Sequence, residues 1–87
     1  MGMVVIHPRV TERHLELSEA DVREAWENYV RMTRRNGFDD HYVAVGFDSS
    51  GRAIEMVAVE TIEGNWYVYH AMTPPTKSLL RELGLMR

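Results

Sequence analysis

Three β-rich runs joined by short turns constrain the fold of this 87-residue chain more than any other feature. They span residues 41–48, 53–62 and 66–72 and are rich in valine, isoleucine, tyrosine and tryptophan, as strands are. Residues 49–52 and 63–65 separate them, and glycine-containing connections of this length join the strands of hairpins. The runs therefore predict an antiparallel meander.

The second hairpin also predicts which side chains share a face of the sheet. If Gly64 and Asn65 form a two-residue turn, Val59 lies opposite His70 and Glu60 lies opposite Tyr69. The face of His70 is then expected to carry Trp66, Val68, Val57 and Val59, and the other face Tyr67, Tyr69, Ile54, Met56 and Ala58. Both faces are largely apolar, so each needs a cover.

A long helix is predicted before the meander, over about residues 19–33. The run from Ser18 to Asp21 has the form of a capping box, and Leu17 and Val22 flank it as a hydrophobic staple does. Apolar residues then recur at helical spacing. Residues 36–37, Asn-Gly, supply a C-terminal signal. This helix is expected to cover one face of the sheet.

Shorter elements are predicted near both ends. Residues 3–7 are expected to form an edge strand, and a proline starts a short helix over residues 8–15. Thr76 can cap a helix over residues 77–83 that closes at Gly84. The sequence thus predicts a single α+β domain, in which N-terminal helices pack on an antiparallel sheet of three or four strands and a short C-terminal helix, or another chain, covers the second face.

Composition narrows the class of protein. The chain has no cysteine and its histidines are scattered, so we expect neither a disulfide nor a metal or cofactor site. Its longest apolar stretches, residues 42–47 and 66–71, are too short to cross a bilayer, and no secretory signal is evident at the N-terminus. A cytoplasmic protein without a membrane partner is expected. Its 45% apolar residues indicate a protein partner or a homodimer.

The charge pattern leaves nucleic-acid binding open. A net charge of −3 argues against it, but local potential guides a polyanion more than net charge does. Arg31, Arg34 and Arg35 form one basic cluster, and Lys77, Arg81 and Arg87 form a second. Arg34 and Arg35 would bind phosphates, with a solvated helix end as the alternative. The aromatic residues Trp26, Tyr29 and Trp66 fit a core or an interface, with nucleobase stacking as the alternative.

The histidines are the main candidates for chemistry. Metal-free RNA cleavage needs a base for the 2′-hydroxyl, an acid for the leaving oxygen and cations for the phosphorane. His70, Lys77 and Arg81 would supply these functions if they converge, with His14 as a second histidine. The alternatives are a structural His70 that is hydrogen-bonded within the sheet, and a His14 that caps a helix or lies at the edge of the core.

Several short motifs follow one another along the chain in an order that can be compared with known families. They are Arg13-His14 before a serine-capped acidic helix, residues 40–46 (Asp-His-Tyr-Val-Ala-Val-Gly), two hairpins, and Tyr69-His70-Ala71 leading into a final helix. Over roughly residues 9–83, this order resembles the BrnT-like toxins of bacterial type II toxin–antitoxin systems. The resemblance implies a RelE-like fold, RNA cleavage without a metal, and inhibition by a cognate antitoxin.

The resemblance also suggests roles for individual residues. His14 matches the histidine before the helix, His41 falls near an acidic-basic-aromatic motif of the family, and Arg81-Glu82 loosely match a final Arg-Glu pair. Met72 stands where the family has a strand-end arginine. We therefore predict a ribonuclease toxin with catalytic residues His70, Lys77, Arg81 and His14 and RNA-binding residues Arg34, Arg35 and His41. The alternative, which the missing arginine favours, is a non-catalytic protein-binding or dimerisation module on the same fold.

Overall fold

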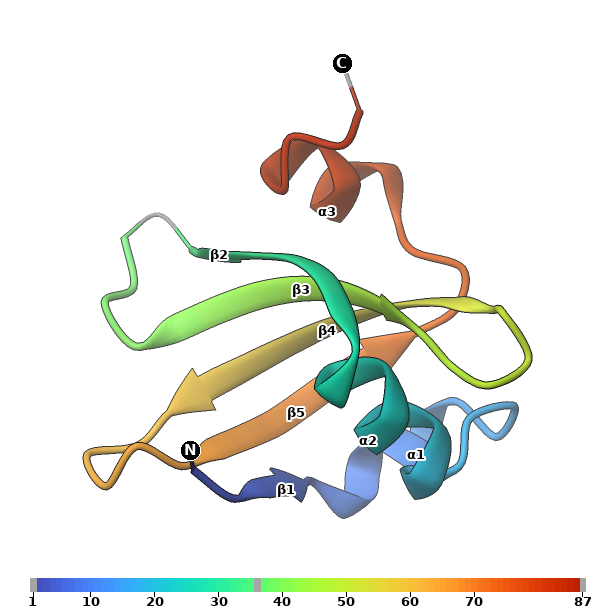
Figure 1. The fold of residues 1–87 in the computed structure, drawn as a ribbon, viewed down its shortest axis with the longest axis horizontal. Helices are drawn as coiled ribbons and strands as arrows, with labels where there is room; N and C mark the ends of the chain where they lie inside the picture. Colours follow the sequence, from blue (N-terminus) through green and yellow to red (C-terminus); the bar gives the residue numbers. More distant parts are fainter. Residues whose placement is uncertain (1, 36, 87) are drawn as a thin grey trace.

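A five-stranded sheet with helices on both faces forms the frame of the chain (Figure 1). The computed structural model describes residues 2–35 and 37–86. The strands are β1 (Val4–Ile6), β2 (Tyr29–Arg34), β3 (His41–Phe47), β4 (Ala53–Glu60) and β5 (Trp66–Met72), in the spatial order β1-β5-β4-β3-β2. The β1–β5 pairing is parallel and the other three are antiparallel. The protein is therefore an α+β domain with a mixed, mostly antiparallel sheet.

The predicted meander is confirmed. The runs predicted over residues 41–48, 53–62 and 66–72 become β3, β4 and β5, which are hydrogen-bonded to one another in chain order. The edge strand predicted over residues 3–7 is confirmed as β1, which extends the sheet beyond β5.

The long helix predicted over residues 19–33 is wrong in its second half. Helix α2 (Glu19–Glu27) ends where the backbone N–H and the side-chain amide of Asn28 both donate to the carbonyl oxygen of Glu24. Tyr29–Arg34 is the outermost strand, β2, and not the end of the helix. Asn36, half of the expected helix-end signal, lies outside the described residues.

The burial of β3 explains why residues 29–34 form a strand and not the end of a helix. Four consecutive β3 residues, from Val43 to Gly46, are buried, so both edges of this strand need hydrogen-bonding partners. The segment after α2 contains the β-branched residues Val30 and Thr33, which suit a strand, and its pairing covers the free edge of β3. A tertiary pairing has therefore overridden a helical pattern, and the sheet has five strands instead of three or four.

The other helix predictions are confirmed. The Ser18 hydroxyl accepts from the Asp21 amide at 3.1 Å, and the Asp21 carboxylate accepts from the Ser18 amide at 3.0 Å, which is the expected capping box. Helix α1 (Pro8–Arg13) starts with its proline, and α3 (Lys77–Glu82) is capped by the Thr76 hydroxyl. Among the described residues, no helix has both the length and the apolar character needed to span a bilayer.

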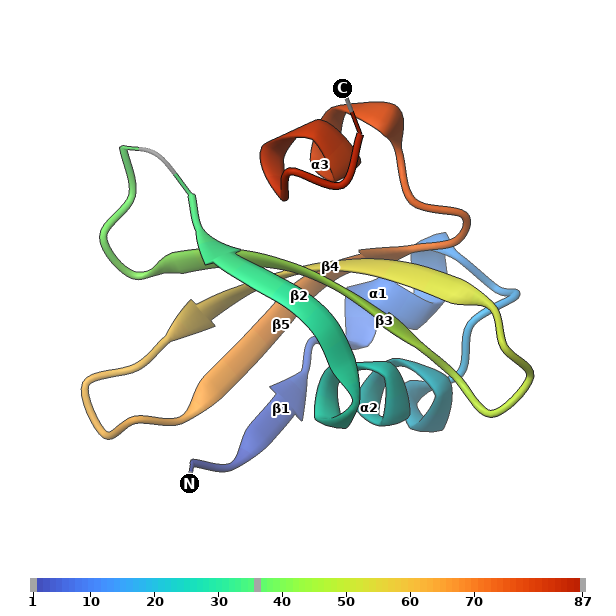
Figure 2. The same cartoon turned by 45° about the horizontal axis from the view of Figure 1, so that its top comes forward.

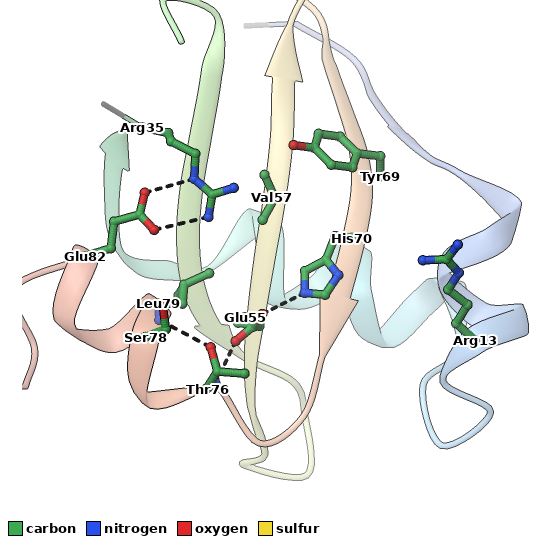
Figure 3. A pocket seen from close by; sticks show the side chains of 10 residues that line it. All are labelled: Arg13, Arg35, Glu55, Val57, Tyr69, His70, Thr76, Ser78, Leu79 and Glu82. Carbon is green, nitrogen blue, oxygen red and sulfur yellow. Dashed lines mark hydrogen bonds and ion pairs between the residues drawn. The ribbon is translucent and has the colours of Figure 1, made fainter. Parts of the chain in front are cut away.

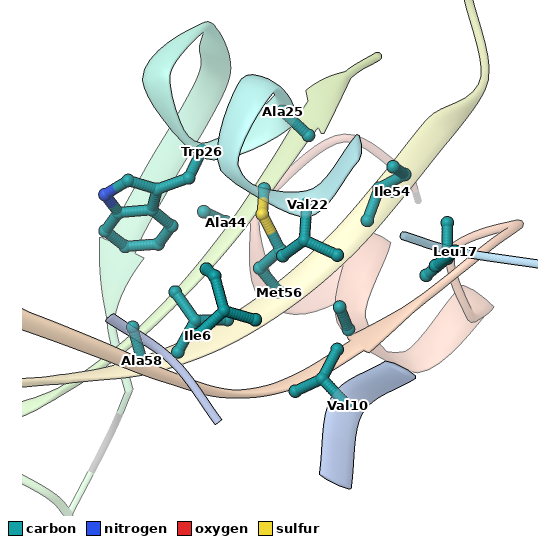
Figure 4. Close-up of a cluster of buried hydrophobic side chains, with 12 residues drawn as sticks. Ile6, Val10, Leu17, Val22, Ala25, Trp26, Ala44, Ile54, Met56 and Ala58 are labelled. Atoms are coloured by element: carbon teal, nitrogen blue, oxygen red, sulfur yellow. The ribbon is translucent and has the colours of Figure 1, made fainter. Parts of the chain in front are cut away.

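The helices lie in two layers around the sheet (Figure 2). Helices α1 and α2 cover one face, which we call the α2 face, and α3 packs on the other, the α3 face. The main core lies under α1 and α2 (Figure 4) and comprises Ile6, Val10, Leu17, Val22, Ala25, Trp26, Ala44, Ile54, Met56, Ala58, Val68 and Ala71. A smaller core beneath α3 contains Val43, Val45, Val57, Leu79 and Leu83. Both apolar faces thus have the covers that were expected.

The register of the second hairpin differs from the prediction. The turn spans five residues, from Thr61 to Asn65, so Glu60 pairs with Trp66 and Val59 with Tyr67. The predicted two-residue turn, and with it the pairing of Val59 with His70, is therefore wrong.

A β-bulge in β5 changes which side chains share a face. Val57 pairs with His70 and Ala58 with Val68, so Tyr69 is an extra residue without a partner in β4. Because of this extra residue, Tyr69 and His70 both lie on the α3 face, whereas Val68 belongs to the core under α2. His70 shares a face with Val57, as predicted, but its predicted grouping with Trp66 and Val68 is wrong. Tyr67 and Tyr69 likewise do not lie with Ile54, Met56 and Ala58 as predicted.

Ile54 tests the main core. Its side chain is fully buried, whereas Ile62 in the hairpin turn is fully exposed. Ile54→Ala should lower the free energy of unfolding by about 2–5 kcal/mol, because it removes buried methyl groups and leaves a cavity. The matched change Ile62→Ala should alter it by less than about 0.5 kcal/mol. Urea denaturation followed by circular dichroism measures both, and equal effects would contradict the described core.

Candidate functional site

A polar cleft of about 330 Å³ opens on the α3 face of the sheet, beside α3 and the end of α1 (Figure 3). Its lining residues are Arg13, Arg35, Glu55, Val57, Tyr69, His70, Thr76, Ser78, Leu79 and Glu82. They come from α1, β4, β5, α3 and the segment after β2, so only the folded chain brings them together. The cleft is therefore the place where the structure gathers groups capable of chemistry.

Glu55 is the buried centre of this cleft, with 4% of its surface exposed. One carboxylate oxygen lies 2.6 Å from Nε2 of His70, and the other accepts from the backbone N–H of Thr76 at 2.6 Å. Burial alone would raise the pKa of Glu55, but these hydrogen bonds outweigh it and hold the pKa below its ordinary value. Glu55 is therefore ionised at neutral pH.

An ionised Glu55 determines which ring nitrogen of His70 carries the proton. A carboxylate without a proton only accepts hydrogen bonds, so the proton between the two groups belongs to Nε2 of His70. In the neutral ring, Nδ1 then carries a lone pair that does not point at Glu55. The structure thus gives His70 the orientation of a general base, in which a carboxylate accepts from Nε2 and leaves Nδ1 to take up a proton.

His14 lies next to His70, as was predicted for two residues of one site. The ring centroids are 6.3 Å apart and the ring planes are perpendicular. His14 follows the last residue of α1, where its backbone N–H donates to the Val10 carbonyl at 3.2 Å, and its Nδ1 lies 3.6 Å from a carboxylate oxygen of Glu16. His70 in the cleft thus has a second imidazole beside it, and each of the two rings has its own carboxylate, although His14 is not among the residues that line the cleft.

Arginines supply the positive charge of the cleft, but the two cations that were expected to act with His70 do not. Lys77 and Arg81 are exposed on α3 and do not line the cleft, so they do not converge with His70 there. Arg13 and Arg35 line it instead. Arg35 makes two hydrogen bonds with Glu82, at 2.9 and 3.1 Å, whereas Arg13 has no carboxylate partner among the described residues.

The predicted pair Arg34 and Arg35 is divided between the two faces of the sheet. Arg35 reaches the cleft, but Arg34 lies on the α2 face, with its guanidinium carbon 5.9 Å from the centre of the Tyr42 ring. His41 lies on the α3 face, where its ring centroid is 5.9 Å from that of Tyr69 and its Nδ1 is 2.9 Å from an Asp40 oxygen. Of the three predicted RNA-binding residues, Arg35 and His41 therefore share a face.

The fold gathers all four histidines of the chain on the α3 side of the sheet. His7 contacts Tyr67 at 5.5 Å between ring centroids and lines a second pocket, of about 250 Å³, with Arg9, Arg13 and Tyr69. This pocket shares Arg13 and Tyr69 with the cleft, so the two hollows are adjacent. The result is a cationic and aromatic track that leads to His70. Among the described residues, no group of three or more metal-binding side chains is positioned to hold an ion.

Comparison with known proteins yields no match, whether with protein-family models, curated proteins or solved structures.

Three residues of the site were missed in the sequence. Glu55 carried a signal, because a single carboxylate amid the apolar residues of a β-run is seldom buried without a partner. Arg13 stands directly before His14 and was noted only as part of a motif. Tyr69 gave no signal, because its place in the cleft depends on the bulge.

Glu55→Gln should change how stability depends on pH. The folded-state pKa of Glu55 is depressed, so its stabilising effect is fully present above the unfolded-state pKa of about 4.3 and is lost as pH falls through the folded value. We expect the variant to be about 1–3 kcal/mol less stable near pH 7, and this deficit to shrink by about pH 3. Urea denaturation at both pH values measures this, with exposed Glu63→Gln as the control. A deficit that does not change with pH would contradict it.

Proposed function

We propose that this chain is a metal-independent endoribonuclease of the BrnT-like, RelE-fold toxin type, with its active site in the cleft. The observation that carries the proposal is the pair of neighbouring histidines, one of which is oriented by buried Glu55, beside an arginine that has no carboxylate partner among the described residues. Two imidazoles and a cation are the groups that metal-free cleavage of a phosphodiester requires.

The proposed reaction is an internal transesterification. Nδ1 of His70 takes the proton of the 2′-hydroxyl, and the 2′-oxygen forms a bond to phosphorus. The bond from phosphorus to the 5′-oxygen breaks, and protonated His14 gives its proton to that oxygen. The products are a 2′,3′-cyclic phosphate and a 5′-hydroxyl, so atoms and protons balance without a co-reactant. Glu55 is a positioning residue, because it acts through His70.

Positive charge and aromatic rings would hold the substrate. Arg13, together with Arg35, would stabilise the charge that develops on the phosphorane. The neighbouring pocket adds Arg9 and shares Tyr69 with the cleft, a combination suited to a single-stranded backbone and a stacked base. This local track, and not the net charge of −3, governs how a polyanion approaches.

The toxin assignment rests on the motifs of the sequence and on the order of the elements. Helices that precede a meander and a short final helix above it support a RelE-like arrangement. A cognate antitoxin would inhibit the protein by covering the cleft.

A non-catalytic binding or dimerisation module is the second candidate. Strand β2 is one of the two edge strands of the sheet, so one of its edges has no partner strand in the described part of the chain, and Tyr29 and Val30 on it are exposed. Such an edge can accept a strand from a second copy of the chain or from a partner. Intact RNA in the assay below, together with a dimer in sedimentation, would favour this function.

The purified chain should cleave a single-stranded RNA oligonucleotide in the presence of EDTA. Fragments should end in a 2′,3′-cyclic phosphate, and the DNA oligonucleotide of the same sequence should stay intact because it lacks the 2′-hydroxyl. His70→Ala and His14→Ala should each lower the rate by about 10²-fold or more. Gel electrophoresis and mass spectrometry of the fragments give both readouts.

Replacing single cations by glutamine tests whether cleavage depends on the cleft or on other parts of the surface. Arg13→Gln should lower the cleavage rate by about 10²-fold, whereas Lys77→Gln and Arg81→Gln should leave it within about twofold. Expression of the wild-type chain alone should arrest bacterial growth, and expression of His70→Ala should not. Loss of activity in Lys77→Gln but not in Arg13→Gln would place the site elsewhere, and intact RNA with the wild-type chain would refute the proposal.

A further inference from the structure

A separate hollow lies on the α2 face, on the opposite side of the sheet from the cleft. It has a volume of about 620 Å³ and lies between β1, the end of α2 and the turn that joins β4 to β5. Its lining includes Trp26, Tyr29, Trp66, Glu27 and Glu60, and we call it the aromatic groove. None of these residues lines the cleft.

Aromatic rings form one wall of the groove. The ring of Trp26 lies 5.2 Å from that of Trp66 and 6.4 Å from that of Tyr29, measured between centroids. Tyr29 is 49% exposed, so its ring is available to a ligand. Among the described residues, neither indole N–H has a hydrogen-bond partner in the protein, and neither is buried without one. The faces of such rings attract cations.

Two carboxylates supply the charge of the groove. Glu27 and Glu60 both line it, and neither forms an ion pair with another of the described residues. No lysine, arginine or histidine is among the lining residues. The groove therefore repels a polyanion such as RNA and favours a cation that fits between aromatic rings.

A guanidinium of the chain itself already lies against an aromatic ring next to the groove. Arg34 places its guanidinium over the ring of Tyr42 at 5.9 Å, and Tyr42 in turn contacts Trp66 at 5.0 Å between centroids. The row of aromatic side chains on the α2 face thus already holds one guanidinium. The part of the row inside the groove, next to Glu27 and Glu60, has none among the described residues.

We infer that the aromatic groove binds an arginine side chain that a partner protein presents. A guanidinium is planar, stacks on tryptophan and tyrosine, and forms paired hydrogen bonds with carboxylates, so it uses both walls of the groove. An ammonium uses them less well, because it is a compact charge that cannot stack. This inference goes beyond the proposed nuclease function, since it concerns the other face of the sheet and a protein ligand.

The groove can be tested without a label, because Trp26 and Trp66 are the only tryptophans of the chain. Titration with Nα-acetyl-arginine amide should change tryptophan fluorescence saturably and should shift both indole N–H signals in NMR spectra. The neutral isostere Nα-acetyl-citrulline amide should bind at least about tenfold more weakly, because it lacks the charge. Glu27→Gln and Glu60→Gln should each weaken arginine amide binding by about fivefold.

Glu12→Gln is the matched control, since Glu12 is exposed on α1 and does not line the groove. It should bind arginine amide as the wild type does. The two groove variants should cleave RNA at the wild-type rate, and His70→Ala should bind arginine amide normally, so the two proposals fail independently. Equal binding of the citrulline amide, stronger binding of adenosine monophosphate, or no saturable change up to about 100 mM arginine amide would overturn the inference.

Discussion

The carboxylate of Glu55 accepts hydrogen bonds from the ring of His70 and from the backbone of Thr76, in a part of the protein from which water is almost excluded. A buried charge is strongly unfavourable unless such partners satisfy it. The same contact ties β4 to the first turn of α3 and holds the histidine at the rim of the cleft. This one interaction therefore supports both the attachment of α3 to the sheet and the geometry of the site.

The bulge in β5 places further side chains beside the Glu55–His70 contact. It places Tyr69 and His70 on the same face of the sheet, although they are neighbours in a strand. The α3 face thereby collects histidines, arginines and tyrosines, while the α2 face keeps the tryptophans and two carboxylates that form no ion pair with another described residue. The two faces are suited to opposite ligands, an anion on one and a cation on the other.

Features set by neighbouring residues were predictable from the sequence, and features set by distant contacts were not. The capping box at Ser18, the Thr76 cap and the β-rich runs depend on local chemistry, and they were predicted correctly. Strand β2 was predicted as helix, because its pairing with β3 is visible only in the fold. His14 and His70 were predicted to belong to one site. Arg13 lines the cleft, whereas Lys77 and Arg81 do not. The sequence could not show this, because the direction in which the side chains of α1 and α3 point depends on how these helices pack.

The state of the His70 ring tests this account most directly. Long-range ¹H–¹⁵N NMR spectra distinguish a proton on Nε2 from one on Nδ1 in a neutral imidazole ring. If Glu55 orients His70, the wild-type ring will carry its proton on Nε2, and Glu55→Gln will weaken that preference. A wild-type His70 that carries its proton on Nδ1 would contradict the role of Glu55 and, with it, the assignment of His70 as the base.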